Sequence, residues 1–398
     1  MVEEVEFLVV GCGPAGGTAA REAARAGVAT VVLDKDAVVG SKRVCAAGLR
    51  PGFCEAFDLP RSIVHCDTPR LALFDASGRE HVVMFGPGHT TTREELDGTI
   101  ARLAQADGAQ VRTSSLFRGL RREGERVVVD YADLRSGERK TIAARNVFLA
   151  PGSTAKLESE SAFAFGQWRD GLMTTLQYRV YLARPAAAVV YQTLELHYYG
   201  ADDGRQIVAW MFPKRDHLAI GLGFVGKMAG AQLREELDRF TQRVRDRLYP
   251  GIGHAVKLEG HLLYGGLPRP HIGTAGAMVG GTAAGLVDAT NGEGIYEAAM
   301  TGRFAAAAVA GARAGRRAAP QEYEERTKRR FYRRLRHRVT LMRYLESRPA
   351  RYGVLFEQLA NAQRFADILQ REDHERTMSD RIYLYGQALR FAARGARA

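Results

Sequence analysis

Hydrophobic positions near the start of the chain change period twice and predict a β-strand, an α-helix and a second strand. Residues 5–10 form a short, nearly continuous apolar run, which is typical of a buried strand. Residues 14–26 are rich in alanine, with Pro14 in the first turn and Gly27 just past the end, and this favours a helix. Residues 28–34 are apolar again. The pattern therefore predicts a compact βαβ unit.

The later pattern predicts a long β-rich stretch and then a return to the first sheet. From about residue 174 to 224 the period is that of strands, interrupted by turn signals around Gly204 and Asp216. A strand at 276–280 follows, with a glycine-rich turn and an alanine-rich helix to about residue 313. Further strands are expected at 126–132, 139–150, 176–182, 189–199 and 206–224, and further helices at 94–107, 229–248, 320–346, 350–371 and 378–394.

This order of elements predicts an α/β fold with a discontinuous nucleotide-binding part. We expect a Rossmann-like lobe at residues 1–170 plus 266–315, interrupted by a β-rich substrate lobe at 171–265. A basic helical segment at 316–398 completes the chain. A length of 398 residues suits two lobes and an appendage.

The most informative motif is Gly11-Cys12-Gly13-Pro14-Ala15-Gly16, which joins the first strand to the first helix. In a dinucleotide site Gly11 allows the tight turn, Gly13 lets the backbone approach a pyrophosphate, and Gly16 lets helix and strand pack closely. The helix N-terminus then faces the phosphates. Asp34 ends the second strand, followed by Lys35, and its carboxylate can accept hydrogen bonds from ribose hydroxyls. The order strand, motif, helix, strand and acid favours a dinucleotide site over a glycine-rich packing turn.

Charge is distributed unevenly along the chain. The net charge is +12, and residues 302–398 carry 22 Lys/Arg against 10 Asp/Glu, so the whole excess lies there. Such a segment could face anionic lipid, nucleic acid or another polyanion. No nucleic-acid motif accompanies it, and nucleic acid is not expected as a partner.

Composition gives no sign of export or of a metal site. The first seven residues carry three glutamates and no basic residue, unlike a secretory signal, and no run of eighteen apolar residues occurs. The four cysteines have neither CxxC nor zinc-ligand spacing. We therefore expect reduced thiols, no metal and a cytoplasmic location.

Two further segments make the resemblance specific. Arg93-Glu94-Glu95-Leu96-Asp97 opens a predicted helix, and the run from Gly280 to Ile295 reads Gly-Gly-Thr-Ala-Ala-Gly-Leu-Val-Asp-Ala-Thr-Asn-Gly-Glu-Gly-Ile. With the first motif, these segments resemble flavoproteins of the p-hydroxybenzoate hydroxylase fold. Among them the chain is most similar to the geranylgeranyl reductase family, in the branch that saturates the prenyl tail of chlorophyll and bacteriochlorophyll.

The resemblance implies an FAD site assembled from both ends of the chain. Arg93 would lie beside the flavin side of the pyrophosphate, and a helix opening near residues 283–285 would point at the pyrophosphate and ribityl chain. Gly292 and Gly294 would let the backbone approach the isoalloxazine ring. The full set of implied cofactor-binding residues is Gly11, Gly13, Pro14, Ala15, Gly16, Asp34, Lys35, Cys45, Arg93, Gly281, Ala284, Gly285, Gly292, Gly294 and Ile295.

Two positions depart from the family pattern. Gly281 stands where the family has an aspartate that bonds a ribityl hydroxyl, and Pro151 stands in place of the aspartate of Ala-Asp-Gly. Loss of a charged hydrogen bond should weaken FAD binding by about 1.5–3 kcal/mol, and Thr282 or water could compensate. A relative that binds no flavin is the alternative.

The resemblance also indicates where substrate binds. The family's Cys-Gly-Gly stretch reads Cys45-Ala46-Ala47 here, and Cys45 could donate a proton or simply be a small buried side chain. The Tyr-x-Trp-x-Phe-Pro stretch keeps Trp210 and Phe212 but has Val208 for tyrosine. These aromatic residues would flank an apolar tail or only pack the sheet. Isolated histidines such as His65, His81, His197 and His254 are expected to be structural.

The implied reaction is reduction of carbon–carbon double bonds in an isoprenoid chain by hydride transfer from reduced FAD, with NADPH as electron donor. Arginines and aromatic residues at 328–339 would dock on an anionic membrane surface that holds the prenylated substrate, or form a solvated helix face. Two other classes stay open. One is an FAD-dependent monooxygenase of an aromatic or lipid substrate, and the other is a prenyl-lipid-binding protein with a degenerate FAD site. The oligomeric state is not predicted.

Overall fold

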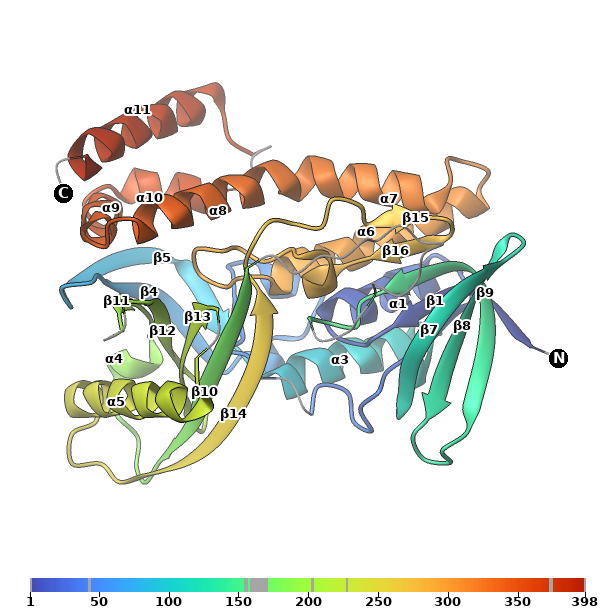
Figure 1. Ribbon diagram of the computed structural model, residues 1–398, viewed down its shortest axis with the longest axis horizontal. Helices are drawn as coiled ribbons and strands as arrows, with labels where there is room; N and C mark the ends of the chain where they lie inside the picture. The colour runs from blue at the N-terminus through green and yellow to red at the C-terminus, as the bar shows by residue number, and fades with distance from the viewer. Residues whose placement is uncertain are drawn as a thin grey trace.

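Two eight-stranded β-sheets form the centre of the protein, with helices packed around them (Figure 1). They are seen in a computed structural model that describes residues 2–41, 44–153, 157, 171–201, 204–226, 228–371 and 375–396. The predicted α/β fold class is confirmed.

The first sheet has the parallel centre expected of a nucleotide-binding lobe, in the order β15-β16-β9-β1-β2-β6. Strands β16, β9, β1, β2 and β6 run parallel to one another, whereas β15 pairs antiparallel with β16. The long strand β9 also pairs antiparallel with β8, which pairs with β7. The bounds are β1 Glu3–Val10, β2 Thr30–Leu33, β6 Gln110–Arg112, β7 Ser115–Glu123, β8 Arg126–Asp133, β9 Arg139–Leu149, β15 Gly273–Thr274 and β16 Ala277–Val279.

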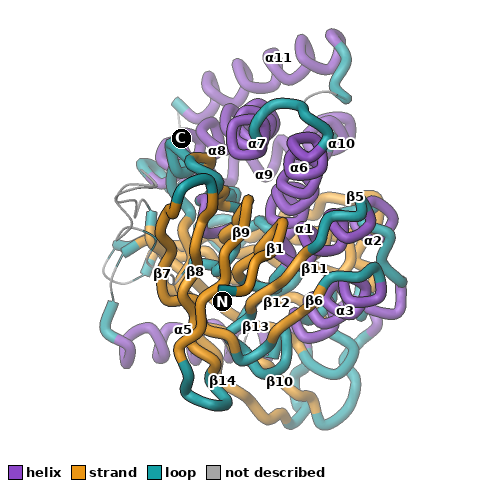
Figure 2. The backbone as a smooth tube through the Cα atoms, turned by 90° about the vertical axis from the view of Figure 1, so that its right-hand side faces the viewer, coloured by secondary structure: helices purple, strands orange, loops and turns teal. Residues whose placement is uncertain are grey.

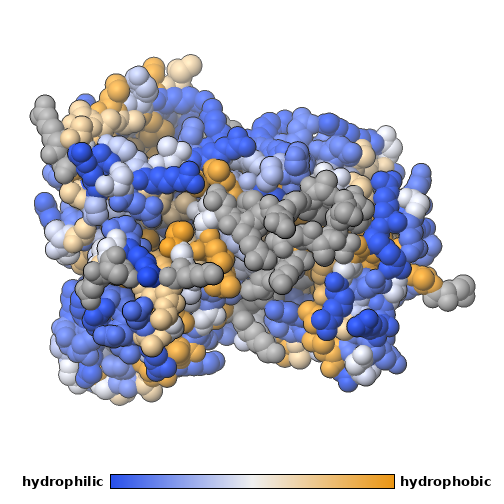
Figure 3. Space-filling view, in the orientation of Figure 1, coloured by the Kyte–Doolittle hydropathy of each residue, from blue (hydrophilic) through white to orange (hydrophobic). Residues whose placement is uncertain are grey.

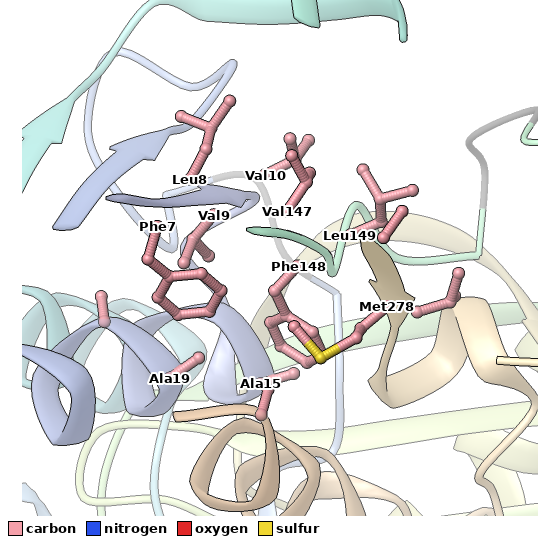
Figure 4. Packing of buried hydrophobic residues seen from close by; sticks show 14 of the residues in the cluster. Phe7, Leu8, Val9, Val10, Ala15, Ala19, Val147, Phe148, Leu149 and Met278 are labelled. Carbon is pink, nitrogen blue, oxygen red and sulfur yellow. The ribbon is translucent and has the colours of Figure 1, made fainter. Parts of the chain in front are cut away.

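Helices cover this sheet because its strands are apolar on both faces. Phe7, Val9 and Phe148 lie on the side of the first helix, whereas Leu8 and its neighbours point to the other side (Figure 4). A Cβ added at Gly302 would lie 2.2 Å from the Ala15 carbonyl oxygen, so the first and sixth helices cross in backbone contact. The bounds are α1 Pro14–Arg25, α3 Arg93–Ala106 and α6 Ile295–Arg313.

The second sheet has the order β14-β10-β13-β12-β11-β4-β5-β3 and is antiparallel except where β11 pairs with β4. Helix α5 packs on one face through Leu237 and Phe240. The strands are β3 Gly48–Leu49, β4 Cys66–Phe74, β5 Glu80–Thr90, β10 Leu172–Leu182, β11 Thr193–Gly200, β12 Gln206–Pro213, β13 Leu218–Val225 and β14 His254–Tyr264. The helices nearby are α2 Phe53–Ala56, α4 Ala188–Tyr191 and α5 Gly230–Leu248, with a 3₁₀ turn at Arg61–Ile63.

The C-terminal helices form a layer beside α6, visible from the side in Figure 2. A π-helical turn joins α7 to α8, so the two form one long rod. In the described part of the chain, no helix is long and apolar enough to span a bilayer. The bounds are α7 Ala319–Thr327, the π-helical turn Lys328–Tyr332, α8 Arg333–Glu346, α9 Ala350–Ala360, α10 Gln363–Gln370 and α11 Met378–Gly395.

The structure corrects three details of the sequence-based assignment. Residues 189–191, expected in a strand, belong to the short helix α4. The predicted helix at 350–371 is divided into α9 and α10. Strands β3, β4 and β5 belong to the second sheet although they precede residue 171, because β4 pairs with β11 far along the chain. The end of the predicted first segment at residue 170 lies outside the described residues.

Candidate active site

The glycine turn after β1 has the geometry that a pyrophosphate-binding loop requires. Gly11 has φ +89°, and a Cβ there would lie 2.3 Å from the Ala150 carbonyl oxygen. A Cβ at Gly16 would lie 1.8 Å from the Gly11 carbonyl oxygen. Gly13 caps α1 in an extended conformation and meets only side-chain atoms. The turn therefore presents open backbone at Gly13 and at the N-terminus of α1.

Asp34 fixes this turn against the end of β2. One carboxylate oxygen accepts the Cys12 amide at 2.6 Å, and the other accepts the Asp36 amide at 2.9 Å. Asp34 is 2% exposed, whereas Lys35 beside it is exposed. Each oxygen has a second lone pair, and a contact with ribose stays a prediction.

Arg93 lies over the glycine turn. A Cβ added at Gly13 would be 3.2 Å from one Arg93 guanidinium nitrogen, which itself lies 2.6 Å from the Asp97 carboxylate. Burial disfavours the charge, but Asp97 raises the pKa of Arg93 further above its ordinary value. Arg93 also interacts with the Cys45 side chain. A permanent cation thus lies where the resemblance places the pyrophosphate.

The second glycine-rich segment meets the first at the start of α1. A Cβ at Gly281 would lie 3.2 Å from the Ala15 Cβ, and the Gly281 amide donates to the Thr301 hydroxyl at 3.2 Å. Gly281 has φ +59°, so an aspartate there would be strained as well as crowded. The glycine thus fits this particular turn, whatever its effect on cofactor affinity.

The helix expected to open near residue 283 does not begin there. Residues Gly281–Ala284 form a 3₁₀ turn that ends at Gly285, and α6 begins only at Ile295, capped by Gly294. The intervening loop includes Gly292, which has φ +74° and no atom closer than 4.0 Å to an added Cβ. The loop, rather than the helix, thus offers open backbone.

A short segment links the nucleotide turn to the second sheet. Cys45 contacts Arg93 on one side, and a Cβ at Gly48 would lie 2.7 Å from the Phe212 ring on the other. On β12, Trp210 donates its indole N–H to Gln177 at 3.0 Å and lies over Gly221. The predicted site residues of the two lobes are therefore connected through residues 45–48.

Lys214, which was not predicted as a site residue, anchors this segment. The residue is 1% exposed, and its amine donates to the Ala46 and Ala47 carbonyl oxygens at 2.5 and 3.4 Å. Burial lowers the pKa of Lys214 to about 7, although Cys45 and Cys66 favour the charged form. A lysine after Phe-Pro suggests an exposed turn, and nothing in the sequence signals its burial.

A buried ion cluster at the start of α6 was also missed. The Glu297 carboxylate lies 3.2 Å from the Arg50 guanidinium and also pairs with Arg334 of α8. Arg50 lies 2.7 Å from Glu293 and 3.9 Å from the Tyr296 ring centroid. The Gly-Glu-Gly-Ile loop is thus tied both to residue 50 and to the C-terminal rod.

The run at residues 328–339, interpreted as a docking or a solvated face, has one buried and one exposed side, and membrane docking by it stays a prediction. Phe331 and Leu335 are fully buried. Arg334 pairs with Glu297, and Arg338 lies 3.1 Å from Asp288. The opposite side of the helix is basic and exposed at Arg329, Arg333, Arg336 and His337.

Three of the four isolated histidines have carboxylate partners. His65 lies 3.1 Å from Glu95, His81 lies 2.8 Å from Asp75, and His197 lies 3.1 Å from Glu195. These pairs fit a structural role. Within the described ranges, no cluster of three or more His, Cys, Asp or Glu side chains could hold a metal ion.

Comparison with known proteins finds geranylgeranyl reductases among the similar sequences. No protein-family model matches the chain. Digeranylgeranylglycerophospholipid reductase of Thermoplasma acidophilum is 28% identical over 360 residues, covering 83% of this chain and 85% of the relative. Geranylgeranyl diphosphate reductase of Synechocystis is 26% identical over 382 residues, covering 92% and 84%.

Solved structures share the fold. A geranylgeranyl bacteriochlorophyll reductase-like protein from Thermoplasma acidophilum superimposes with a TM-score of 0.70 at 23% identity, covering 96% of this chain and 95% of that one. A p-nitrophenol 4-monooxygenase from Pseudomonas putida gives 0.73 at 16% identity, covering 91% and 95%.

The chain therefore shares the two-sheet α/β fold of these solved structures. The chain is related to the geranylgeranyl reductase family of FAD-dependent oxidoreductases, and the resemblance seen in the sequence is confirmed.

Proposed function

We propose that the protein reduces carbon–carbon double bonds in the isoprenoid chain of a lipophilic molecule, with FAD as cofactor and NADPH as electron donor. The observation that carries the proposal is the link through residues 45–48, between Arg93 at the glycine turn and Phe212 on the second sheet. This link supports a site in which the cofactor would lie next to an apolar wall. The curated relatives named above are reductases of geranylgeranyl compounds.

The residues present fit FAD. The open backbone at Gly13 and the cation of Arg93 suit the pyrophosphate, and the exposed loop at Gly292 suits a flat ring that approaches main chain. When bound, the flavin supplies the hydride. Trp210 and Phe212 would hold the apolar chain and exclude water. Lys214 would keep residues 45–47 in place through its two carbonyl contacts.

The first experiment is an absorption spectrum of the purified protein before and after incubation with FAD and desalting. We expect flavin bands that survive desalting. Incubation of that sample with NADPH and a geranylgeranyl lipid, without oxygen, should yield products two mass units heavier for each bond reduced. Consumption of NADPH only in the presence of oxygen would indicate a monooxygenase instead. A colourless protein that takes up no FAD but binds prenyl lipid would indicate the degenerate binding protein.

Cys45 is the proposed proton donor, since its side chain lies between Arg93 and the segment held by Lys214. Cys45→Ala should lower kcat by about 100-fold with unchanged flavin retention and little change in KM. Cys66→Ala is the matched control, because Cys66 also lies near Lys214 but on β4. If Cys45→Ala were as active as wild type, Cys45 would not be the proton donor.

A further inference from the structure

The C-terminal helix α11 is the outermost element of the described structure (Figure 1). Its inner face is held firmly by the helices beneath it. The Gln358 amide donates to the Gln387 carbonyl oxygen at 2.9 Å, and Arg394 lies 2.9 Å from Glu357. A capping box between Thr377 and Asp380 fixes the start of the helix. The helix is therefore a defined part of the fold and presents a constant outer face.

That outer face is apolar. Four large side chains are exposed at helical spacings of four, three and four residues. They are Met378, Ile382, Tyr385 and Leu389, at 73%, 67%, 68% and 54% exposure. At 100° per residue they form one stripe on the side opposite Gln387. Apolar residues gather at the outer edge of the molecule over this helix (Figure 3). A surface helix normally turns its apolar stripe inward, and this one turns a stripe outward.

Basic side chains flank the stripe. Arg381 lies on one side of it and Arg390 on the other, and both are exposed. The one acidic residue of the helix, Asp380, is buried and lies 3.0 Å from Arg371. The helix also belongs to the segment of residues 302–398 that carries the whole net charge of +12. Apolar stripe and positive flanks are the signature of a helix that lies in the surface of an anionic bilayer.

We propose that α11 docks the protein on an anionic lipid surface, with Met378, Ile382, Tyr385 and Leu389 inserted among the acyl chains. This surface is distinct from the basic run at residues 328–339. The inference rests on the proposed function in one respect: a membrane contact would give the enzyme access to an isoprenoid substrate held in the bilayer.

The size of the stripe argues against a second copy as its occupant. A helix of 18 residues is about 27 Å long and about 10 Å wide, so its outer face offers roughly 300 Å². A stable dimer buries about 800 Å² per partner. Two such faces would also bring their arginines together, whereas an anionic bilayer neutralises them.

The test is flotation of the full-length protein with vesicles. Wild type should float with phosphatidylcholine vesicles that contain about 30% phosphatidylglycerol, and much less with pure phosphatidylcholine or in high salt. The double variant Ile382→Gln/Leu389→Gln should bind at least tenfold more weakly. The matched control is Leu134→Gln/Val256→Gln, which removes two apolar side chains that are 50% and 45% exposed elsewhere, and it should float like wild type.

Three results would overturn the proposal: no flotation of wild type, equal flotation of the α11 variant, or a wild-type dimer in sedimentation that the α11 variant abolishes. Circular dichroism checks that the variants are folded. Flavin absorbance is recorded on the same samples. If the protein retains flavin but does not bind vesicles, only the docking proposal is refuted. If it binds vesicles but retains no flavin, only the proposed enzymatic function is refuted.

Discussion

Replacement of Gly13 by valine is expected to abolish retention of FAD while the protein stays folded. The backbone of Gly13 is extended, with φ −76° and ψ −168°, which valine adopts without strain. An added Cβ meets only the ends of the Arg93 and Asp97 side chains, at 3.2 and 3.8 Å. The new methyl groups would fill the space in which the pyrophosphate meets the main chain. FAD affinity should fall by about 100-fold or more, a loss of at least about 3 kcal/mol, measured by flavin fluorescence titration.

Two variants make this result specific. Gly230→Val places the same side chain at the start of α5, where an added Cβ meets nothing within 4 Å, and should bind FAD like wild type. Gly16→Val should fail to fold, because its Cβ would lie 1.8 Å from the Gly11 carbonyl oxygen. If Gly13→Val kept wild-type affinity, the cofactor would not approach this turn and the proposed site would be misplaced.

Local patterns predicted the nucleotide lobe well because its elements follow one another closely. The predicted strand 5–10 and helix 14–26 correspond to Glu3–Val10 and Pro14–Arg25, and Gly11 and Gly16 have the predicted steric roles. Spacing and side-chain period decide such a unit within about thirty residues.

Long-range pairing could not be predicted in the same way. Strand β4 is a mixed polar and apolar segment whose parallel partner β11 lies more than one hundred residues later. Its place in the second sheet depends on pairing with β11 and not on the alternation of polar and apolar residues within β4 itself. The family resemblance likewise predicted a helix beginning near Ala283. Gly285 instead adopts a left-handed conformation, and α6 begins only at Ile295.

Buried charge was the other feature that sequence could not reveal. A lysine or an arginine usually indicates an exposed position, so Lys214 was assigned to a turn and Arg334 to an outer face. Lys214 is buried and Arg334 is half-buried because acceptors come from other elements: carbonyl oxygens of residues 46 and 47, and the carboxylate of Glu297. The chemistry of the site therefore depends on contacts that a single sequence does not display.

Glu297→Gln should change how stability depends on pH. Glu297 is fully buried, and burial together with Glu293 raises its pKa from 4.5 to about 7, against the opposing effect of Arg50 and Arg334. The folded protein then holds this proton to a higher pH than the unfolded chain. The resulting stabilisation is complete below about pH 4.5 and is lost as the pH rises to about 7.

Glutamine has nearly the same shape as protonated Glu297 and stays uncharged at every pH. The free energy of unfolding of wild type should therefore fall relative to Glu297→Gln by about 3 kcal/mol between pH 4.5 and 7.5. Urea unfolding of both proteins at the two pH values measures this difference, and other titrating groups cancel in the comparison. Glu293→Gln removes the neighbouring carboxylate and should make the wild-type change smaller. A wild type that instead gains stability over this range would mean that Arg50 and Arg334 hold Glu297 ionised, and that the cluster is a charged clamp between the glycine loop and α8.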